Sequence, residues 1–358
     1  MKINLLLNPA NRGWVIQKIA EHIADELGLL GVQGTITDTP DASADIVHHM
    51  SWAFANIRTP QPSTMFITHL DDVFKLNQVR ATLAAEVRVG ICMSSDTMRQ
   101  LAAHGCPAGS LYYVSPAHDG LVHPRRIVIG VTSRVYADGR KREALLQEVA
   151  RRMDLSPFEF RIFGLGWEPT NAVLEAAGAK VTYFGETDDF RKDYETLQAT
   201  VPTFDHYLYL GMDEGSLGTL DALAAGVSTI VTPQGFHLDL PEGITHPVVT
   251  ADDLARAFEG IAAPVRARTA AVAGLTWAEH TLRHLAVWRA LAEGRELPPL
   301  PEPEPEADAQ TRRAGAEAYR SRSMTANALS PRRLLSAVSH WPPLRPLRRA
   351  VDRIRLRR

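Results

Sequence analysis

Short apolar runs alternate with amphipathic stretches along most of this sequence, and that alternation constrains the fold more than any other feature. Residues 3–7 form the first apolar run, and residues 15–27 then carry isoleucine and leucine at helical spacing. Strands that alternate with helices predict parallel βαβ units and a doubly wound sheet, because consecutive parallel strands need a long crossover between them. Within the first 120 residues the same criteria predict further strands at 34–37, 45–49, 64–68, 87–93 and 111–114, and helices at 75–86 and 96–104.

The alternation starts again after a turn-rich segment near residues 117–126. The sequence therefore predicts an α/β protein with two Rossmann-like doubly wound parallel-sheet domains facing a cleft, an N-terminal domain over 1–120 and a C-terminal domain over 121–296. Long alanine- and leucine-rich helices at 251–262 and 270–293 are expected to close the second domain. Ligands of parallel sheets bind beyond the carboxyl ends of the strands, so we expect the site in the cleft. The second domain should contain strands at 127–131, 158–163, 180–184, 206–210 and 228–232, and helices at 142–153, 171–177, 189–197 and 217–225.

The net charge of −2 conceals two unlike regions. Residues 311–358 contain 13 arginines and two acids, a local charge of +11, whereas the rest of the chain carries −13. A proline- and glutamate-rich linker at 297–310 separates the two regions and is expected to be extended and solvated. The near-neutral total argues against a dedicated nucleic-acid binder, while the asymmetry between an acidic body and a basic tail predicts a surface or polymer partner.

The end of the tail has the pattern of a basic amphipathic helix. Leu347, Val351 and Ile354 stand at i, i+4 and i+7 among arginines, shortly after Trp341. Such a helix is suited to lie on an anionic lipid surface, so we expect the segment from Trp341 to Arg358 to contact the inner membrane leaflet. A disordered arginine-rich tail is the alternative. The body has two cysteines and no apolar stretch as long as a membrane span, and we expect it to be cytoplasmic.

Several familiar sites are excluded by inspection. The sequence has no G-x-x-x-x-G-K-[ST], no H-E-x-x-H, no C-x-x-C and no Asp-x-Asp. Gly164 and Gly166 open like a dinucleotide fingerprint, but Glu168, Pro169 and Thr170 stand where the third glycine is needed. We therefore expect no metal site and no cofactor.

A cationic loop follows the predicted strand at 127–131. Arg134 and Lys141 stand seven residues apart in front of a predicted helix. Fixed cations and helix-start amides can absorb the charge that develops on a departing pyrophosphate without a metal. The alternative is that Arg134, Arg140 and Lys141 are only solvated surface charges.

A second polar segment follows the predicted strand at 206–210. It contains the acids Asp213 and Glu214, then small residues, then a helix that carries Asp221. Glycines beside a helix start let backbone amides approach a ligand, and Asp221 is placed to accept hydrogen bonds from ribose hydroxyls. The alternative for the two acids is that they only favour the helix N-terminus through its dipole. Four residues of this segment are assigned to ligand binding: Asp221, Gly215, Ser216 and Gly218. Three glycines at turns elsewhere in the sequence are assigned to the same donor-binding set: Gly13, Gly164 and Gly235.

The two segments together resemble the C-terminal domain of GT-B fold glycosyltransferases. The likeness is closest to the retaining, family-4-like enzymes that include many bacterial polysaccharide and lipid-linked sugar transferases. In that family the first donor-domain strand ends in Gly-Arg, and a short loop then ends in Lys-Gly. Ser133 and Arg134 occupy the first pair of places here, and Lys141 and Arg142 occupy the second.

The acidic motif of the same family is Glu-x7-Glu followed by Ala-x-Ala-x-Gly. The segment from Asp213 to Gly226 is similar to it, with Asp213 or Glu214 as the first acid and Asp221, one methylene shorter than glutamate, as the second. The likeness covers about residues 85–286, and the N-terminal half matches only in general pattern.

The resemblance implies transfer of a sugar from a nucleotide-diphosphate donor to a hydroxyl of a glycan or lipid-linked acceptor, with the anomeric configuration retained. Arg134 and Lys141 would stabilise the departing nucleoside diphosphate in place of a metal. Asp213 or Glu214 would orient the sugar, and Asp221 would hold the ribose. Two rival functions remain open: a non-catalytic scaffold or sugar-nucleotide-binding subunit, and another GT-B enzyme such as a sugar-nucleotide epimerase.

Histidines give weaker predictions in the N-terminal half. His69 follows a central strand, so we expect it to bind the acceptor or to help remove its proton. A satisfied loop histidine is the alternative. His48 and His49 lie at the end of a strand read as edge-like and receive no role.

Overall fold

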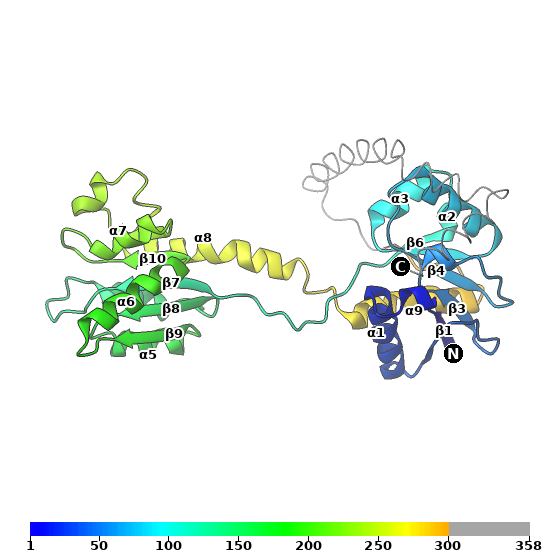
Figure 1. Cartoon of the computed structure of the whole chain (residues 1–358), viewed down its shortest axis with the longest axis horizontal. Coiled ribbons are helices and arrows are strands. Elements are labelled where there is room, and N and C mark those ends of the chain that lie inside the picture. Colours follow the sequence, from blue (N-terminus) through cyan, green and yellow to red (C-terminus); the bar gives the residue numbers. More distant parts are fainter. Residues whose placement is uncertain (301–358) are drawn as a thin grey trace, which may run out of the picture. The chain divides into compact units, whose positions relative to one another are not determined.

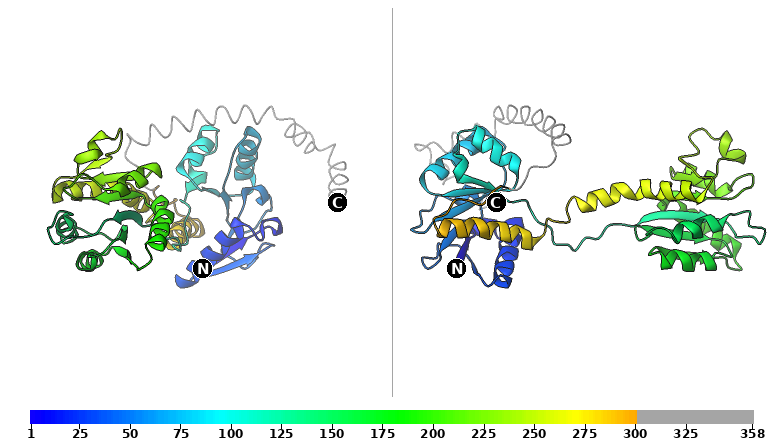
Figure 2. Two further views of the ribbon diagram at one scale, coloured as in Figure 1. Left: turned by 60° about the vertical axis from the view of Figure 1, so that its left-hand side comes forward. Right: turned by 180° about the vertical axis from the view of Figure 1, so that it is seen from behind.

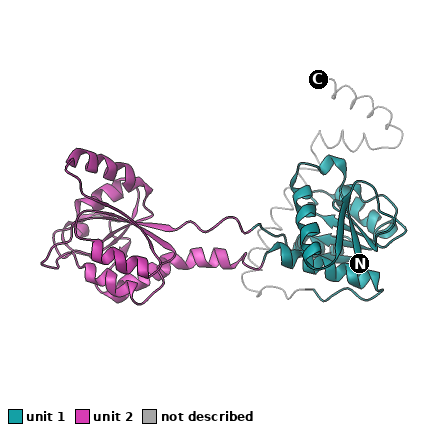
Figure 3. Cartoon of the chain, turned by 90° about the horizontal axis from the view of Figure 1, so that it is seen from below, with its two compact units in different colours: residues 1–119, 275–358 teal, residues 120–274 magenta. Residues whose placement is uncertain are grey.

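The computed structural model describes residues 1–300, which form two compact units (Figure 3). The first unit contains residues 1–119 and 275–300, and the second contains residues 120–274. The linker from residue 301 and the whole basic tail, with its predicted membrane-binding helix, lie outside the described residues.

The sheet of the first unit has six strands, all parallel, in the order β2-β1-β3-β4-β5-β6 (Figure 1). Each crossover between these strands is therefore long enough to hold a helix or an extended loop. The strands are β1 (Lys2–Leu6), β2 (Gln33–Thr37), β3 (Ile46–His49), β4 (Ser63–Ile67), β5 (Val89–Cys92) and β6 (Leu111–Tyr113). The helices are α1 (Val15–Leu29), α2 (Val73–Ala85), α3 (Ser95–Ala103) and α9 (Trp277–Ala292), with short 3-10 turns at Pro9–Asn11, Trp52–Phe54 and Ala108–Ser110.

Helices cover both faces of this first sheet. On one face Ile23 and Leu27 of α1 pack with Trp288 of α9, and on the other Val79 of α2 packs with Leu101 of α3. These residues are buried, and Ile23 and Leu27 lie four positions apart on α1, the amphipathic period seen in the sequence. Burial on both faces explains why β3 reads as a continuous buried strand rather than an alternating one. β3 lies between β1 and β4, so the sequence was wrong to read the strand of His48 and His49 as edge-like.

The sheet of the second unit also has six parallel strands, in the order β12-β11-β10-β7-β8-β9. Counted within the unit, this is the Rossmann order, which reverses direction between its first and fourth strands, β7 and β10. The strands are β7 (Ile127–Thr132), β8 (Phe158–Phe163), β9 (Lys180–Gly185), β10 (His206–Tyr209), β11 (Ser228–Val231) and β12 (His246–Pro247). The helices are α4 (Glu143–Ala150), α5 (Glu168–Ala176), α6 (Phe190–Thr200), α7 (Leu217–Ala224) and α8 (Ala251–Ala270), with 3-10 turns at Val201–Thr203 and Gly235–Asp239.

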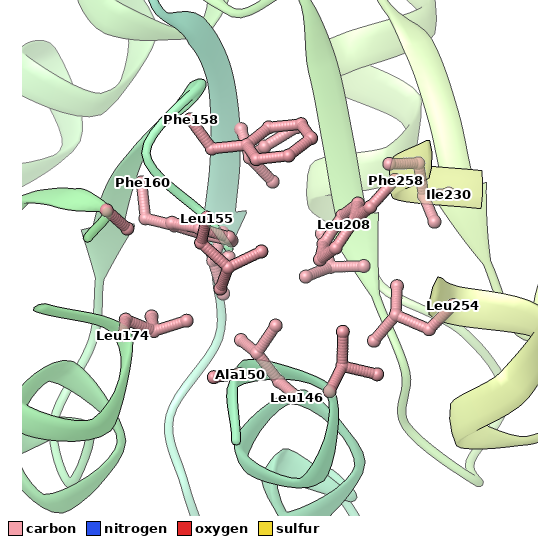
Figure 4. Packing of buried hydrophobic residues seen from close by; sticks show 14 of the residues in the cluster. Leu146, Ala150, Leu155, Phe158, Phe160, Leu174, Leu208, Ile230, Leu254 and Phe258 are labelled. Carbon is pink, nitrogen blue, oxygen red and sulfur yellow. The ribbon is translucent and has the colours of Figure 1, made fainter. Parts of the chain in front are cut away.

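An aromatic cluster forms the centre of the larger core of the second unit (Figure 4). The rings of Phe158 and Phe160 on β8 pack on Phe258 of α8, with centroids 5.0 and 6.0 Å from it. On the opposite face Gly130 of β7 leaves room for Phe204, because a Cβ at that position would lie 2.1 Å from the ring. The sheet therefore carries apolar cores on both faces, as a doubly wound fold requires.

The predicted fold class, α/β with two Rossmann-like doubly wound parallel-sheet domains, is confirmed. The predicted extent of the second domain is corrected at its end, because α9 belongs to the first unit (Figures 1 and 2). Leu285 and Trp288 of α9 are buried in the core of the first sheet, and the indole Nε1 of Trp288 donates to Thr64 Oγ1 at 3.0 Å. Of the two helices that were predicted to close the second domain, α8 is the one that packs in the core of the second unit. Within residues 1–300, no helix is both long and apolar enough to cross a membrane.

Candidate active site

The reversal of strand order in the second sheet places polar side chains at the carboxyl ends of β7 and β10. Ligands of doubly wound proteins bind at such a switch point, because neighbouring crossovers leave it in opposite directions and open a crevice there. Thr132 ends β7, and Tyr207 and Tyr209 lie on β10. The two segments that the sequence singled out, around Arg134 to Lys141 and around Asp213, follow these same two strands.

Lys141 is held at this switch point by two oxygen atoms. Its Nζ donates to Asp213 Oδ2 at 2.7 Å and to the Tyr209 hydroxyl at 2.6 Å, and the Tyr209 hydroxyl in turn donates to Asp213 Oδ1. The side chain of Lys141 is only 13% exposed, so this cation is fixed rather than solvated. The structure therefore brings together Lys141 and Asp213, two residues singled out from the sequence, and adds Tyr209, which was not singled out.

The electrostatics of this trio follow from burial and charge. Burial by itself would raise the pKa of Asp213, but the hydrogen bonds from Lys141 and Tyr209 outweigh it, and the pKa of Asp213 is lowered. Burial and the neighbouring carboxylate both raise the pKa of the Tyr209 phenol, which therefore stays protonated and remains a donor. Asp213 is accordingly a carboxylate at neutral pH, with its charge directed at Lys141.

Glu214 takes a different position from Asp213. Its side chain is exposed, and its backbone carbonyl accepts from the amide of Phe236 at 3.0 Å. Of the two acids that the sequence left open, Asp213 is the one in contact with Lys141.

Helix α7 starts against the same switch point. The hydroxyls of Thr132, Tyr207 and Ser216 form a chain with separations of 2.9 and 2.8 Å. Ser216 is the N-cap residue, but its side chain makes no capping bond to the helix. The first amides of α7 therefore have no side-chain cap and carry the partial positive charge that favours an anion.

Gly218 allows this close approach of helix and strands. A Cβ at Gly218 would lie 2.0 Å from Thr132 Oγ1 and 2.6 Å from the Tyr207 hydroxyl. Gly215 and Gly235 have comparable packing requirements: both have positive φ, and a Cβ at Gly235 would lie 2.3 Å from the carbonyl oxygen of Glu214. These glycines set the shape of the loop in front of α7.

His237 fixes the other side of this loop and was not singled out from the sequence. Its Nδ1 lies 3.0 Å from the carbonyl of Thr232, and its Nε2 lies 3.0 Å from Thr219 Oγ1. Because a carbonyl only accepts, Nδ1 carries the proton and Nε2 accepts from the Thr219 hydroxyl. The imidazole is buried and ties α7 to the turn after β11.

A pocket of about 360 Å³ opens beside Arg134, at the carboxyl ends of β7, β8 and β9. Arg134 forms a bidentate ion pair with Glu186, and this pairing raises the pKa of the guanidinium. Phe190 and Tyr194 of α6 stack with centroids 5.9 Å apart and line the pocket. The full lining is Thr132, Ser133, Arg134, Phe163, Gly164, Gly185, Glu186, Thr187, Asp188, Phe190, Asp193, Tyr194 and Leu197.

Glu186, Phe190 and Tyr194 were not predicted from the sequence as pocket residues. One signal was present: Glu186 is the second residue after the strand predicted at 180–184, where side chains reach the carboxyl edge of the sheet. Tyr207 and Tyr209 gave another signal, because alternate residues of a strand share a face.

The remaining predicted residues lie elsewhere. Asp221 is exposed on α7, close enough to Tyr207 for its charge to contribute to raising that pKa, but it does not line the pocket. Gly13 and His69 belong to the first unit. The Gly13 amide donates to Gln17 Oε1 at 2.8 Å, and His69 Nδ1 lies 2.9 Å from Thr68 Oγ1.

Arg142 occupies an unusual backbone conformation next to Lys141. Its φ is +55°, in the left-handed region that favours glycine, and its guanidinium donates to the carbonyl of Val249. The place where the resembling family has glycine is therefore one where the backbone itself favours glycine. Among the described residues, no group of three or more histidine, cysteine, aspartate or glutamate side chains is arranged to hold a metal ion.

Comparisons with known proteins yield no sequence family. No protein-family model and no curated protein matches the chain. Among solved structures, Anabaena HepE in complex with UDP and glucose is 13% identical and covers 83% of this chain and 95% of its own, with a TM-score of 0.29.

Two further solved structures are similar over comparable lengths. The lipopolysaccharide outer core galactosyltransferase WaaB is 13% identical over 79% of this chain and 97% of its own, with a TM-score of 0.33. A glycosyltransferase from Rickettsia africae is 11% identical over 81% and 98%, with a TM-score of 0.30. At these TM-scores the likenesses carry no argument about this chain, and the assignment of two Rossmann-like domains rests on its own strand order.

Proposed function

We propose that this protein is a glycosyltransferase that moves a sugar from a nucleotide-diphosphate donor to a hydroxyl acceptor, with retention and without a metal. The observation that carries the proposal is the fixed cation at the switch point. Lys141 is held by Asp213 and Tyr209. Asp213 lies three residues before Ser216, the N-cap residue of α7, and that helix has no side-chain cap. A cation beside helix-start amides is a place for a diphosphate.

The pocket beside Arg134 supports a nucleoside at the other end of the donor. Thr132 lines this pocket, and its hydroxyl joins the chain that leads through Tyr207 to the start of α7. The pocket and the helix start therefore share a wall. Stacked Phe190 and Tyr194 offer a nucleobase an aromatic surface, and Arg134 lies where the first phosphate would emerge.

In the proposed reaction the bond between the anomeric carbon and the diphosphate oxygen breaks, and the electron pair stays with the diphosphate. Lys141 and Arg134 stabilise the charge that develops there. The acceptor oxygen bonds to the anomeric carbon from the same face, and its proton passes to the departing phosphate oxygen. Asp213 keeps Lys141 in place and presents a carboxylate for the sugar hydroxyls.

The acceptor is proposed to bind the first unit, with His69 as a contact, and to be a glycan or a lipid-linked oligosaccharide. The basic segment from Trp341 to Arg358, outside the described residues, is proposed to bring the enzyme to an anionic membrane surface at the inner leaflet.

The proposal predicts that nucleoside diphosphates protect the protein against thermal unfolding. UDP-, GDP-, dTDP- and CMP-sugars should be screened for the shift in melting temperature, which also identifies the donor. Arg134→Ala and Lys141→Ala should each weaken binding at least about tenfold, because each removes a charge-assisted contact worth about 1.5–3 kcal/mol. Arg151→Ala, which removes a cation from the far end of α4, is the matched control.

Three outcomes would count against the proposal. Unchanged binding in both variants would show that the diphosphate does not lie at the switch point. Binding without consumption of the donor by any acceptor would favour the scaffold or sugar-nucleotide-binding subunit. Consumption of the donor without an acceptor, yielding an isomeric sugar nucleotide, would favour an epimerase.

A further inference from the structure

Both cations of the proposed donor site are already paired with carboxylates, but the two pairs differ in how firmly the acid is held. Asp213 also accepts from the Tyr209 hydroxyl and from the Gly215 amide, at 3.4 Å, so it is fixed from three sides. Glu186 binds Arg134 through both of its carboxylate oxygens. The side chains of Arg134 and Glu186 are 56% and 23% exposed, so water reaches this pair and weakens it.

Both members of the Arg134–Glu186 pair line the proposed donor pocket. Arg134 follows β7 and Glu186 follows β9, and β8 lies between these two strands in the sheet. The ion pair therefore spans the end of β8, where Gly164 also lines the pocket. Any anion that Arg134 binds in this pocket meets the Glu186 carboxylate.

Binding of a diphosphate to Arg134 is unfavourable while Glu186 occupies the same guanidinium. Like charges a few ångströms apart repel, and the guanidinium presents one fork of donors that either a carboxylate or a phosphate can fill. A diphosphate carries more charge than one carboxylate, and the exposed pair is weak in water, so the exchange favours the phosphate.

We propose that Glu186 is a built-in counter-ion that the diphosphate of the donor displaces from Arg134 and that returns when the nucleoside diphosphate leaves. The inference rests on the proposed function and adds a residue that sets affinity and release. Glu186 lowers the affinity of the site for phosphate and thereby limits inhibition by the nucleoside diphosphate product. It takes the place of the phosphate on Arg134 when the pocket is vacated.

The test is a double-mutant cycle on the full chain with inorganic pyrophosphate as the probe. Binding is measured by calorimetry at about 0.15 M salt for wild type, Glu186→Gln, Arg134→Ala and the double variant. All four proteins keep the 13 arginines of the tail, so pyrophosphate that binds there cancels in the cycle. Glu186→Gln should tighten binding about fivefold, and it should have no effect in the Arg134→Ala background.

Asp188→Asn is the matched control for charge alone. Asp188 lines the same pocket and carries the same charge as Glu186, and the ion pair of Arg134 is with Glu186 instead. A gain in Asp188→Asn equal to that in Glu186→Gln would overturn the inference, because it would reflect only the general negative charge of the pocket.

Two other results are decisive and distinguishable. If Arg134→Ala weakens binding but Glu186→Gln does not tighten it, the counter-ion role of Glu186 is wrong and the proposed donor site stands. If Arg134→Ala leaves binding unchanged, Arg134 is not a phosphate ligand and the counter-ion role fails, whereas the proposed donor site fails only if Lys141→Ala also leaves binding unchanged. As a kinetic readout, inhibition by the nucleoside diphosphate product should be about fivefold stronger in Glu186→Gln.

Discussion

At the scale of single residues, Tyr209 shows how neighbours define a role that residue type alone does not. A tyrosine at the end of a buried strand reads as a core residue, and its ring is indeed buried against the second core cluster of the second unit. Its hydroxyl nevertheless lies between Lys141 and Asp213, accepting from one and donating to the other. The phenol therefore limits the positions that the Lys141 ammonium can adopt.

Tyr209→Phe should weaken binding of the nucleoside diphosphate by about five- to tenfold. Without the hydroxyl, Lys141 keeps only one fixed partner, and the conformational freedom that it regains must be lost again when the ligand binds. The measurement is a titration with the donor nucleotide that the screen identifies. Tyr136→Phe removes the hydroxyl of a tyrosine in the loop that carries Lys141 but keeps the ring that contacts Arg140 and Lys141, and it should have no effect. Equal affinity in Tyr209→Phe and wild type would show that Asp213 alone positions the lysine.

The loops that carry Arg134, Lys141 and Asp213 could be singled out from the sequence because the signal is local. All three residues stand in loops that follow a recognisable strand, and charge beyond the carboxyl end of a parallel strand is a signal that a linear sequence carries. Glu186 has the same position after β9, but its meaning depends on Arg134, 52 residues away in the sequence. Pairing across a sheet depends on strand order, which residue patterns do not give.

At the scale of elements, the contact between β3 and α9 contains an unusual concentration of histidine. His48 of β3 lies against His284 of α9, with ring centroids 5.5 Å apart, and His280 and His284 lie 4.4 Å apart. His49 follows His48 on the strand and is also buried. Within the described part of the chain, Nε2 of His48, His280 and His284 has no hydrogen-bond partner. None of the groups that perturb His48 and His284 is an acid that would stabilise a charged imidazole.

Stability should therefore fall as the pH drops below about 6.5. Burial lowers the pKa of His48 to about 3 and of His49 to about 4, and it lowers the pKa of His280 and His284, whereas the unfolded chain binds these protons near pH 6.5. The contribution is complete above pH 6.5 and is lost toward pH 4, by up to about 1.4 kcal/mol per histidine per pH unit.

Thermal unfolding at pH 7.5, 6.5 and 5.5 measures this effect. Burial also lowers the pKa of His206 and His246 in the second unit. His284→Leu should therefore reduce the loss of stability between pH 6.5 and 5.5 by up to about a sixth, because one of six such histidines no longer titrates on unfolding. His123→Ala, at an exposed position in the segment that leaves the first unit, should leave the pH dependence unchanged. A melting temperature that is constant over this range would mean that the cluster is already protonated in the fold.

At the scale of the whole molecule, the chain crosses between its units twice. It leaves the first unit after Asp119 and returns at Leu275, so α9 completes a core whose other members come from the first 119 residues. The amide of His118 donates to the carbonyl of Leu275 at 2.9 Å, and Asp119 accepts from the Trp277 indole at 2.9 Å. Hydrogen bonds therefore join the segment that leaves the first unit to the segment that returns to it. The predicted cleft between the domains stays a prediction.

The candidate site, built from described residues, contains no residue of the basic tail at 311–358. Removing residues 311–358 should leave nucleotide binding unchanged and abolish co-sedimentation with anionic vesicles, since the segment carries a charge of +11 that such a surface attracts. Vesicles that contain phosphatidylserine and purely zwitterionic vesicles are compared at about 0.15 M salt. A truncated protein that still sediments with the anionic vesicles would place membrane contact elsewhere in the chain.

The sequence by itself determined the two parallel sheets, because apolar runs of strand length and helices of amphipathic period follow from neighbours along the chain. It also located Arg134, Lys141 and Asp213 near strand ends. Only the tertiary structure decided that α9 joins the first unit and that Asp213 rather than Glu214 meets Lys141. It likewise decided that Glu186 binds Arg134. The physical reason is that these contacts join residues brought together by strand order and by a returning chain, and a local pattern of hydrophobicity and charge contains neither.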